Sequence, residues 1–142
     1  MPVLSVTRLR VRSWRFFPPF LLYALRSARQ AGRAEGNLAV KLLKDRNRIF
    51  WTVTLWASEA DIKKFMISGV HGRAMRKLLH WCDEAALAHW PQEASALPSW
   101  VEAHSRLQSD GRPSKVNHPS PAHIAHRFPQ PHAGLGSEIN FK

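Results

Sequence analysis

The chain has 142 residues, a length that fits a single domain. With 44% hydrophobic and 22% charged residues it has an ordinary globular composition, which excludes an acidic disordered chain, a collagen and a coiled coil. The net charge of +11 is concentrated in residues 1–50, which carry eleven of the 21 Lys and Arg residues but two of the ten acids. A basic field of this kind attracts polyanions or acidic membrane surfaces.

Two elements are predicted in this basic N-terminal third. Residues 6–14 alternate between arginines and smaller residues, and a period of two predicts a strand with one apolar face. Pro18 and Pro19 follow the strand. Because proline is tolerated in the first turn of a helix, they mark the start of a helix that runs to about Gly32.

A hairpin and two helices are predicted next. Residues 38–44 and 49–56 form two strands around a polar turn, and the second strand is uncharged and rich in β-branched and aromatic residues. Ser58 and Asp61 then form a capping-box pattern with the shorter acid, which predicts the start of a helix. A second helix covers about residues 73–82.

A fourth strand over residues 85–90 completes the order β-α-β-β-α-α-β. A ferredoxin-like α+β fold, an antiparallel sheet with helices on one face, accommodates this order. A capping-box pattern at Ser99 opens a last helix over residues 98–110, so that residues 1–110 form one domain. Residues 111–142 are rich in Pro and His, which predicts a tail or an extended strap rather than a core element.

The segment from Thr54 to Met75, TLWASEADIKKFMISGVHGRAM, is the most informative one. A strand that ends in Trp, then Ser-Glu, then a helix with a paired apolar face and a second helix carrying His resembles the antibiotic-biosynthesis-monooxygenase-like superfamily. The motifs ARQAGRAEGN and FWTVTLW are similar to those of an uncharacterised branch near the spheroidene-monooxygenase-like group. The resemblance covers about residues 5–92 and implies a dimeric α+β barrel, in which two sheets close against each other.

The resemblance also implies site residues. Haem-degrading members use an Asn, a Trp and a proximal His, which correspond here to Thr7, Trp56 and Met75. Two of the three are changed, which argues against haem degradation by that arrangement and leaves these positions as candidates for binding a substrate. Cofactor-free members oxidise electron-rich aromatic substrates with dioxygen and carry a His in a place similar to His71. Such chemistry requires substrate binding, deprotonation and exclusion of water, and no metal or flavin motif.

Individual side chains support this interpretation. His71 is the candidate catalytic base, because an imidazole exchanges protons near neutral pH. Trp56 is the candidate pocket wall, Tyr23 can offer a phenol to the pocket, and Arg76 can hold an anionic substrate. The structural alternatives are a surface histidine, aromatic side chains packed in the core, and a solvated arginine on a helix face.

Other features predict neither redox chemistry nor a metal site. Cys82 is the only cysteine, which excludes an intramolecular disulfide and fits a reducing, cytoplasmic compartment. Two acids follow it directly and would raise the thiol pKa, so we interpret it as a core residue. His118, His123 and His126 lie among prolines and do not predict a metal site. The sequence contains no run of about 18 apolar residues, so no membrane-spanning helix is predicted.

The function predicted is that of a homodimer that binds a small aromatic or apolar molecule, with cofactor-independent monooxygenation as its activity. One alternative is a haem-binding oxygenase of the spheroidene-monooxygenase type. The other is a non-catalytic module that binds a polyanion, with nucleic acid the less favoured partner. The arginines concerned lie on one face of the first strand and on one stripe of the first helix: Arg8, Arg10, Arg12, Arg26, Arg29 and Arg33.

Overall fold

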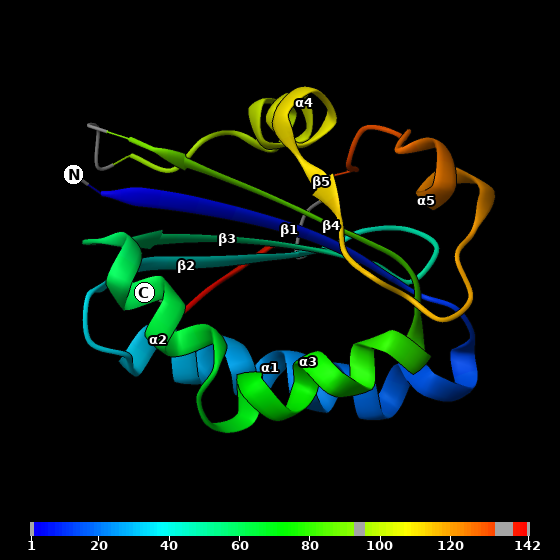
Figure 1. Cartoon of the computed structure of the whole chain (residues 1–142), viewed down its shortest axis with the longest axis horizontal. Coiled ribbons are helices and arrows are strands. Elements are labelled where there is room, and N and C mark those ends of the chain that lie inside the picture. Colours follow the sequence, from blue (N-terminus) through cyan, green and yellow to red (C-terminus); the bar gives the residue numbers. More distant parts are fainter. Residues whose placement is uncertain (1, 93–95, 133–137, 142) are drawn as a thin grey trace.

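The computed structural model of the chain describes residues 2–92, 96–132 and 138–141, and for residues 70–72, 74 and 75 the backbone alone. An antiparallel sheet forms the middle layer, with helices on both of its faces (Figure 1). The strands are β1 (Val3–Val11), β2 (Asn37–Lys44), β3 (Ile49–Trp56), β4 (Cys82–Pro91), β5 (Arg112–Pro113) and β6 (Glu138–Asn140). The helices are α1 (Phe17–Arg33), α2 (Glu59–Met66), α3 (Gly69–Trp81), α4 (Trp100–Asp110) and α5 (Pro121–Ala125), with a short 3-10 turn η1 (Trp14–Phe16) before α1.

The strands of the described part of the chain follow the order β5-β4-β1-β3-β2-β6. The central strands β4-β1-β3-β2, with α1 after β1 and α2–α3 after β3, confirm the predicted ferredoxin-like α+β fold. β1 lies between β3 and β4, with Val6 opposite Val53 on one side and Ala88 on the other. Because successive side chains point to opposite faces of a sheet, this register decides which residues of β1 and β3 meet the helices.

Helices α1, α2 and α3 cover one face of the sheet (Figure 1). Pro18 and Pro19 lie in the first turn of α1, as predicted. Ser58 caps α2, and its hydroxyl accepts a hydrogen bond from the backbone N–H of Asp61 at 3.2 Å, which confirms the predicted helix start. The residues of α1 and α2 buried on this face are Phe20, Ala28, Ala31, Ile62 and Phe65.

Helix α4 covers the opposite face. Trp100, Ala103 and Leu107 of α4 are buried in one apolar cluster with Trp51 of β3, and Phe128 from the C-terminal region belongs to the same cluster. This is the face that was expected to close against a second copy of the chain. Because α4 covers it within the chain, the need to bury an apolar patch does not by itself require a partner. Dimerisation therefore stays a prediction.

Residues 111–132 form a strap that packs along the domain. Val116 is buried in the cluster under α1, and Phe128 is buried under α4. These two apolar side chains anchor an otherwise polar, proline-rich stretch to the domain. In the described part of the chain, no helix has the length and apolar character needed to cross a bilayer.

Candidate functional site

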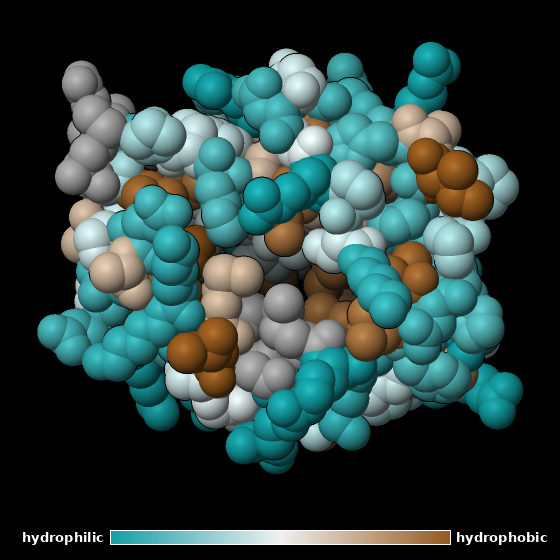
Figure 2. Space-filling view, in the orientation of Figure 1, coloured by the Kyte–Doolittle hydropathy of each residue, from teal (hydrophilic) through white to brown (hydrophobic). Residues whose placement is uncertain are grey.

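A cavity of about 360 Å³ lies between the sheet and helices α1, α2 and α3. Most of its wall is apolar, with Phe20 and Ala24 from α1, Phe65 from α2 and Leu78 from α3. The face of the molecule seen in Figure 2 is hollowed near its centre, between the strands and α3. Volumes of this order are typical of sites for small molecules, which are concave and mostly apolar with a few polar groups.

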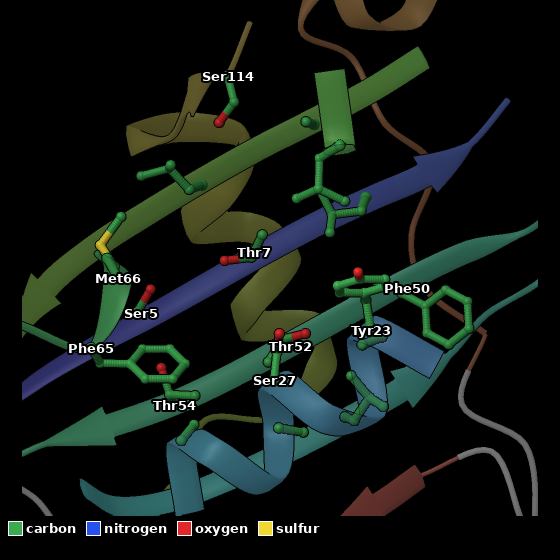
Figure 3. A pocket seen from close by; sticks show the side chains of 18 of the residues that line it. Ser5, Thr7, Tyr23, Ser27, Phe50, Thr52, Thr54, Phe65, Met66 and Ser114 are labelled. Atoms are coloured by element: carbon green, nitrogen blue, oxygen red, sulfur yellow. The ribbon is translucent and has the colours of Figure 1, made fainter. Parts of the chain in front are cut away.

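The floor of the cavity is a grid of four hydroxyl groups. Ser5 and Thr7 of β1 lie opposite Thr54 and Thr52 of β3, so that the four side chains form two adjacent cross-strand pairs on the helix side of the sheet. Figure 3 shows them rising from the two strands. No other described residue forms a hydrogen bond with these hydroxyls. They are therefore available to a ligand in the cavity.

Helix α1 forms the wall that faces this floor. It presents Tyr23 and Ser27 to the cavity, beside alanines that leave space between helix and sheet. The Ser27 hydroxyl is buried and has no hydrogen-bond partner in the described part of the chain. A buried polar group without a partner costs free energy, so the free hydroxyl favours a ligand that can satisfy it.

Polar residues lie at the mouth of the cavity. His89 of β4 lies opposite Ser5 in the sheet, and Lys115 and Ser114 come from the strap just after β5. His89 keeps an exposed edge, but partial burial and the positive charge of Arg112 lower the pKa of its imidazole, although Glu59 acts in the opposite direction. The neutral imidazole is therefore favoured near pH 7, which is the form that accepts a proton.

The structure brings two of the candidate site residues to this cavity. Thr7 lies in its floor and Tyr23 in its wall. Trp56 is fully buried and packs on Phe65, with 5.1 Å between the ring centroids, so that it lies behind the wall and not in it. Arg76 is exposed on α3 and is absent from the described lining.

His71 and Met75 belong to α3, but their side chains lie outside the described residues. The role expected of His71 as a catalytic base therefore stays a prediction. His89 is the imidazole that lines the described cavity.

Sequence analysis identified Thr7 but missed His89, Lys115 and the other three hydroxyl residues of the floor, Ser5, Thr52 and Thr54. A signal for the floor exists, because Thr52 and Thr54 interrupt the most apolar strand at alternate positions. Alternating hydroxyls on an otherwise apolar strand indicate that one face meets something other than a packed core. The cavity role of Lys115 has no such signal, since it depends on where the strap crosses the fold.

Two of the three arginines at β1 are neutralised within the chain. Arg8 is buried, and its Nη1 lies 2.6 Å from Oε1 of Glu84 on β4. Arg10 contacts both Glu84 and Asp83, at 3.3 and 3.1 Å. Arg12 donates to a backbone carbonyl at 2.7 Å. The strand face therefore does not offer three free cations to a polyanion, because acids of the neighbouring strand already pair with two of them.

The arginines of α1 remain exposed. Arg26, Arg29 and Arg33 line an open groove of about 550 Å³ together with Lys64. Two acids, Glu35 and Asp61, also line the groove and reduce its positive charge.

Neither Cys82 nor the C-terminal histidines form a reactive or metal-binding centre in the described part of the chain. Burial, assisted by the charge of Asp83, raises the pKa of the Cys82 thiol to about 12, which supports its interpretation as a core residue. The Nδ1 atom of His123 accepts a hydrogen bond from the backbone N–H of Ala85 at 3.2 Å. No group of three or more His, Cys, Asp or Glu side chains that could hold a metal ion occurs among the described residues.

Comparisons with known proteins place this geometry in a wider context. The model of a family described as Domain of unknown function (DUF3291) matches residues 25–117. The chain matches none of the curated proteins.

Solved structures show the same fold at low sequence identity. Rv0793 from Mycobacterium tuberculosis superposes with a TM-score of 0.61 at 10% identity, covering 68% of this chain and 100% of that one. A putative antibiotic biosynthesis monooxygenase from Nitrosomonas europaea gives 0.58 at 12% identity, covering 65% and 90%. SnoaB from Streptomyces nogalater, a cofactor-independent oxygenase, gives 0.53 at 17% identity, covering 69% and 98%. At these identities the likeness concerns the fold alone.

Proposed function

We propose that the cavity binds a small apolar or aromatic molecule and promotes its oxygenation by dioxygen without a cofactor. The chain that forms this cavity belongs to the DUF3291 family of domains of unknown function. The observation that carries the proposal is the apolar cavity of about 360 Å³ with free hydroxyls on its floor. The likeness in fold to SnoaB, a cofactor-independent oxygenase, supports the choice of reaction.

The chemistry requires a base, a binding surface and a dry site. His89 takes one of the two protons of an acidic methylene group of the substrate, which leaves a carbanion delocalised over the aromatic system. The carbanion transfers its electrons to dioxygen and forms a C–O bond, and the proton held by His89 completes a hydroperoxide. Loss of water from the hydroperoxide gives a ketone, so that one oxygen atom enters the product and the other leaves as water. The apolar wall formed by residues such as Phe20 and Leu78 excludes solvent from the anion.

Ligand binding is tested by filling the cavity. Thr7→Phe places a large ring above the hydroxyl floor, so we expect the saturable binding of an electron-rich aromatic probe, 1-naphthol, to weaken by at least about tenfold. Val101→Phe is the matched control, because Val101 is 60% exposed on α4, on the other face of the sheet. Binding is measured by calorimetry. An affinity that Thr7→Phe leaves unchanged, or no saturable binding to the wild type, refutes the proposed site.

The reaction is tested with an oxygen electrode and an anthrone, whose central methylene group is acidic. His89→Gln should lower oxygen uptake by about 100-fold or more if the imidazole is the general base, while binding of 1-naphthol stays within a factor of two. Equal rates in wild type and His89→Gln refute this role. A haemin titration accompanies the assay, and a saturable Soret shift that Thr7→Phe abolishes would replace the cofactor-free proposal by the haem-dependent alternative.

A second candidate function rests on the groove beside α1. Arg26, Arg29 and Arg33 are exposed around it, and a stripe of guanidinium groups attracts polyanions. The test replaces all three arginines by Gln and measures the salt concentration at which the protein elutes from heparin. The control is Arg127→Gln, which removes one exposed charge elsewhere. If the groove binds polyanions, the triple variant should lower the elution salt concentration by more than three times the shift seen in the control. A shift proportional to charge alone refutes a specific site.

A further inference from the structure

A single charged side chain lines the described part of the cavity. Lys115 borders a cavity whose other described lining residues are apolar, carry hydroxyls or, in the case of His89, favour the neutral form. It lies at the mouth, where its ammonium group keeps contact with solvent. A cation over an apolar cavity attracts an anionic group more strongly than it would in open water, because low-dielectric walls concentrate its field.

The strap fixes the position of Lys115. On one side the backbone N–H of Ser114 donates to Ala85 O of β4 at 2.8 Å, and on the other the N–H of Asn117 donates to Leu79 O of α3 at 2.9 Å. Val116, the next residue, is buried in the cluster under α1. The strap therefore bridges β4 and α3, and it holds the Cα atom of Lys115 at the edge of the cavity while the side chain stays free to reach a ligand.

No acid of the described residues forms an ion pair with Lys115. Arg112 and Glu59 are the charges that act on His89, which lies four residues along β4 from Ala85, and Glu59 also lies 3.6 Å from the Nζ of Lys63. Lys115 therefore has no counter-ion among the described residues, and a ligand can supply one.

From this geometry we infer that the ligand of the cavity is a monoanion, an apolar ring system with one acidic group that Lys115 binds at the mouth. The inference rests on the proposed small-molecule function of the cavity and adds the chemical class of the ligand. The ring system fills the apolar space under α1, and polar substituents at its far end meet the hydroxyls of Thr7 and Thr52 on the floor. Lys115 is thereby a binding and specificity residue and takes no part in proton transfer.

The test compares two probes of the same shape, 2-naphthoate and the neutral 2-naphthamide, by calorimetry on the full chain. We expect the wild type to bind the acid at least about tenfold more tightly. Lys115→Met should remove this preference and leave the affinity for the amide within a factor of two, and Lys115→Arg should restore it. The control is Lys44→Met, which removes an exposed charge whose ammonium lies over Phe17, away from the described lining of the cavity.

The possible results distinguish a wrong ligand class from a cavity that binds no small molecule. Equal affinities of the wild type for the two probes, or an equal loss of both in Lys115→Met, overturn the inference while cavity binding stands. If neither probe binds, both the cavity function and the inference are refuted. A preference for the acid that disappears equally in Lys115→Met and Lys44→Met reflects overall charge and also overturns the assignment to Lys115.

Discussion

Replacing Glu84 by Gln should remove several kcal/mol of folding free energy, because it leaves a buried guanidinium without its counter-ion. Arg8 is 1% exposed, and its Nη1 lies 2.6 Å from the Glu84 carboxylate. Burial alone would raise the pKa of Glu84, but the hydrogen bond and charge of Arg8 outweigh it and lower the pKa. The carboxylate is therefore ionised in the folded state above its ordinary titration range, and the pair contributes stability there.

The magnitude follows from the geometry. Two unit charges about 4 Å apart attract each other by about 4 kcal/mol at an effective dielectric constant of about 20. Breaking a buried pair by removing one partner typically costs about 3–5 kcal/mol. Gln keeps the shape and can still accept a hydrogen bond from Arg8, so we expect the lower end, about 3 kcal/mol. Arg10 is less affected, because Asp83 still lies 3.1 Å from it.

The assay is urea unfolding at pH 7, followed by tryptophan fluorescence. Asp110→Asn is the control, since it breaks the exposed pair with Arg106, whose atoms are 3.7 Å apart, and should cost less than about 1 kcal/mol. A loss below about 1 kcal/mol for Glu84→Gln would show that water screens the Arg8 pair as it screens a surface pair. That result would refute the argument from burial.

Three further predictions concern stability and reactivity. Burial lowers the pKa of His123 below its usual value of about 6.5, so the unfolded chain binds the proton more readily than the folded chain. The free energy of unfolding should therefore fall as the pH drops from about 7 to about 5. His123→Asn can still accept a hydrogen bond from the N–H of Ala85 and should flatten this pH dependence in urea titrations. Cys82, with a thiol pKa of about 12, should not react with iodoacetamide at pH 8 until the protein is unfolded, as mass spectrometry will show. Gly36→Ala should lower the thermal midpoint by several degrees, since Gly36 has a φ of +82° and an added Cβ would collide with the side chain of Asp61.

Sequence patterns predicted the elements whose signals are local. The strand over 49–56 has the predicted bounds, because an uninterrupted run of β-branched and aromatic residues specifies it without help from neighbours. Ser99 caps α4 as predicted, with its hydroxyl accepting from the backbone N–H of Glu102. Both features depend on residues close together in the chain, which a single sequence displays directly.

One error has a local cause, and the others arise where distant residues decide the outcome. β1 was expected to end at Trp14 but ends at Val11, because Ser13 caps the following turn by accepting from the N–H of Arg15. β4 begins at Cys82, three residues earlier than predicted, since its acids pair with the arginines of β1 across the sheet. The cavity was predicted only in outline, because its shape depends on small residues of α1 and on the path of the strap.

Helix α4 changes how the sheet responds to dilution. When one face of a sheet is buried against a separate molecule, its protection follows mass action and weakens as the protein is diluted. Here the helix that buries Trp51 is joined to the sheet by a short connection after β4, so its docking is intramolecular. A tethered element acts at an effective concentration set by its linker, whatever the concentration of the protein. The face under α4 therefore stays covered even in a cell that holds very few copies of the chain.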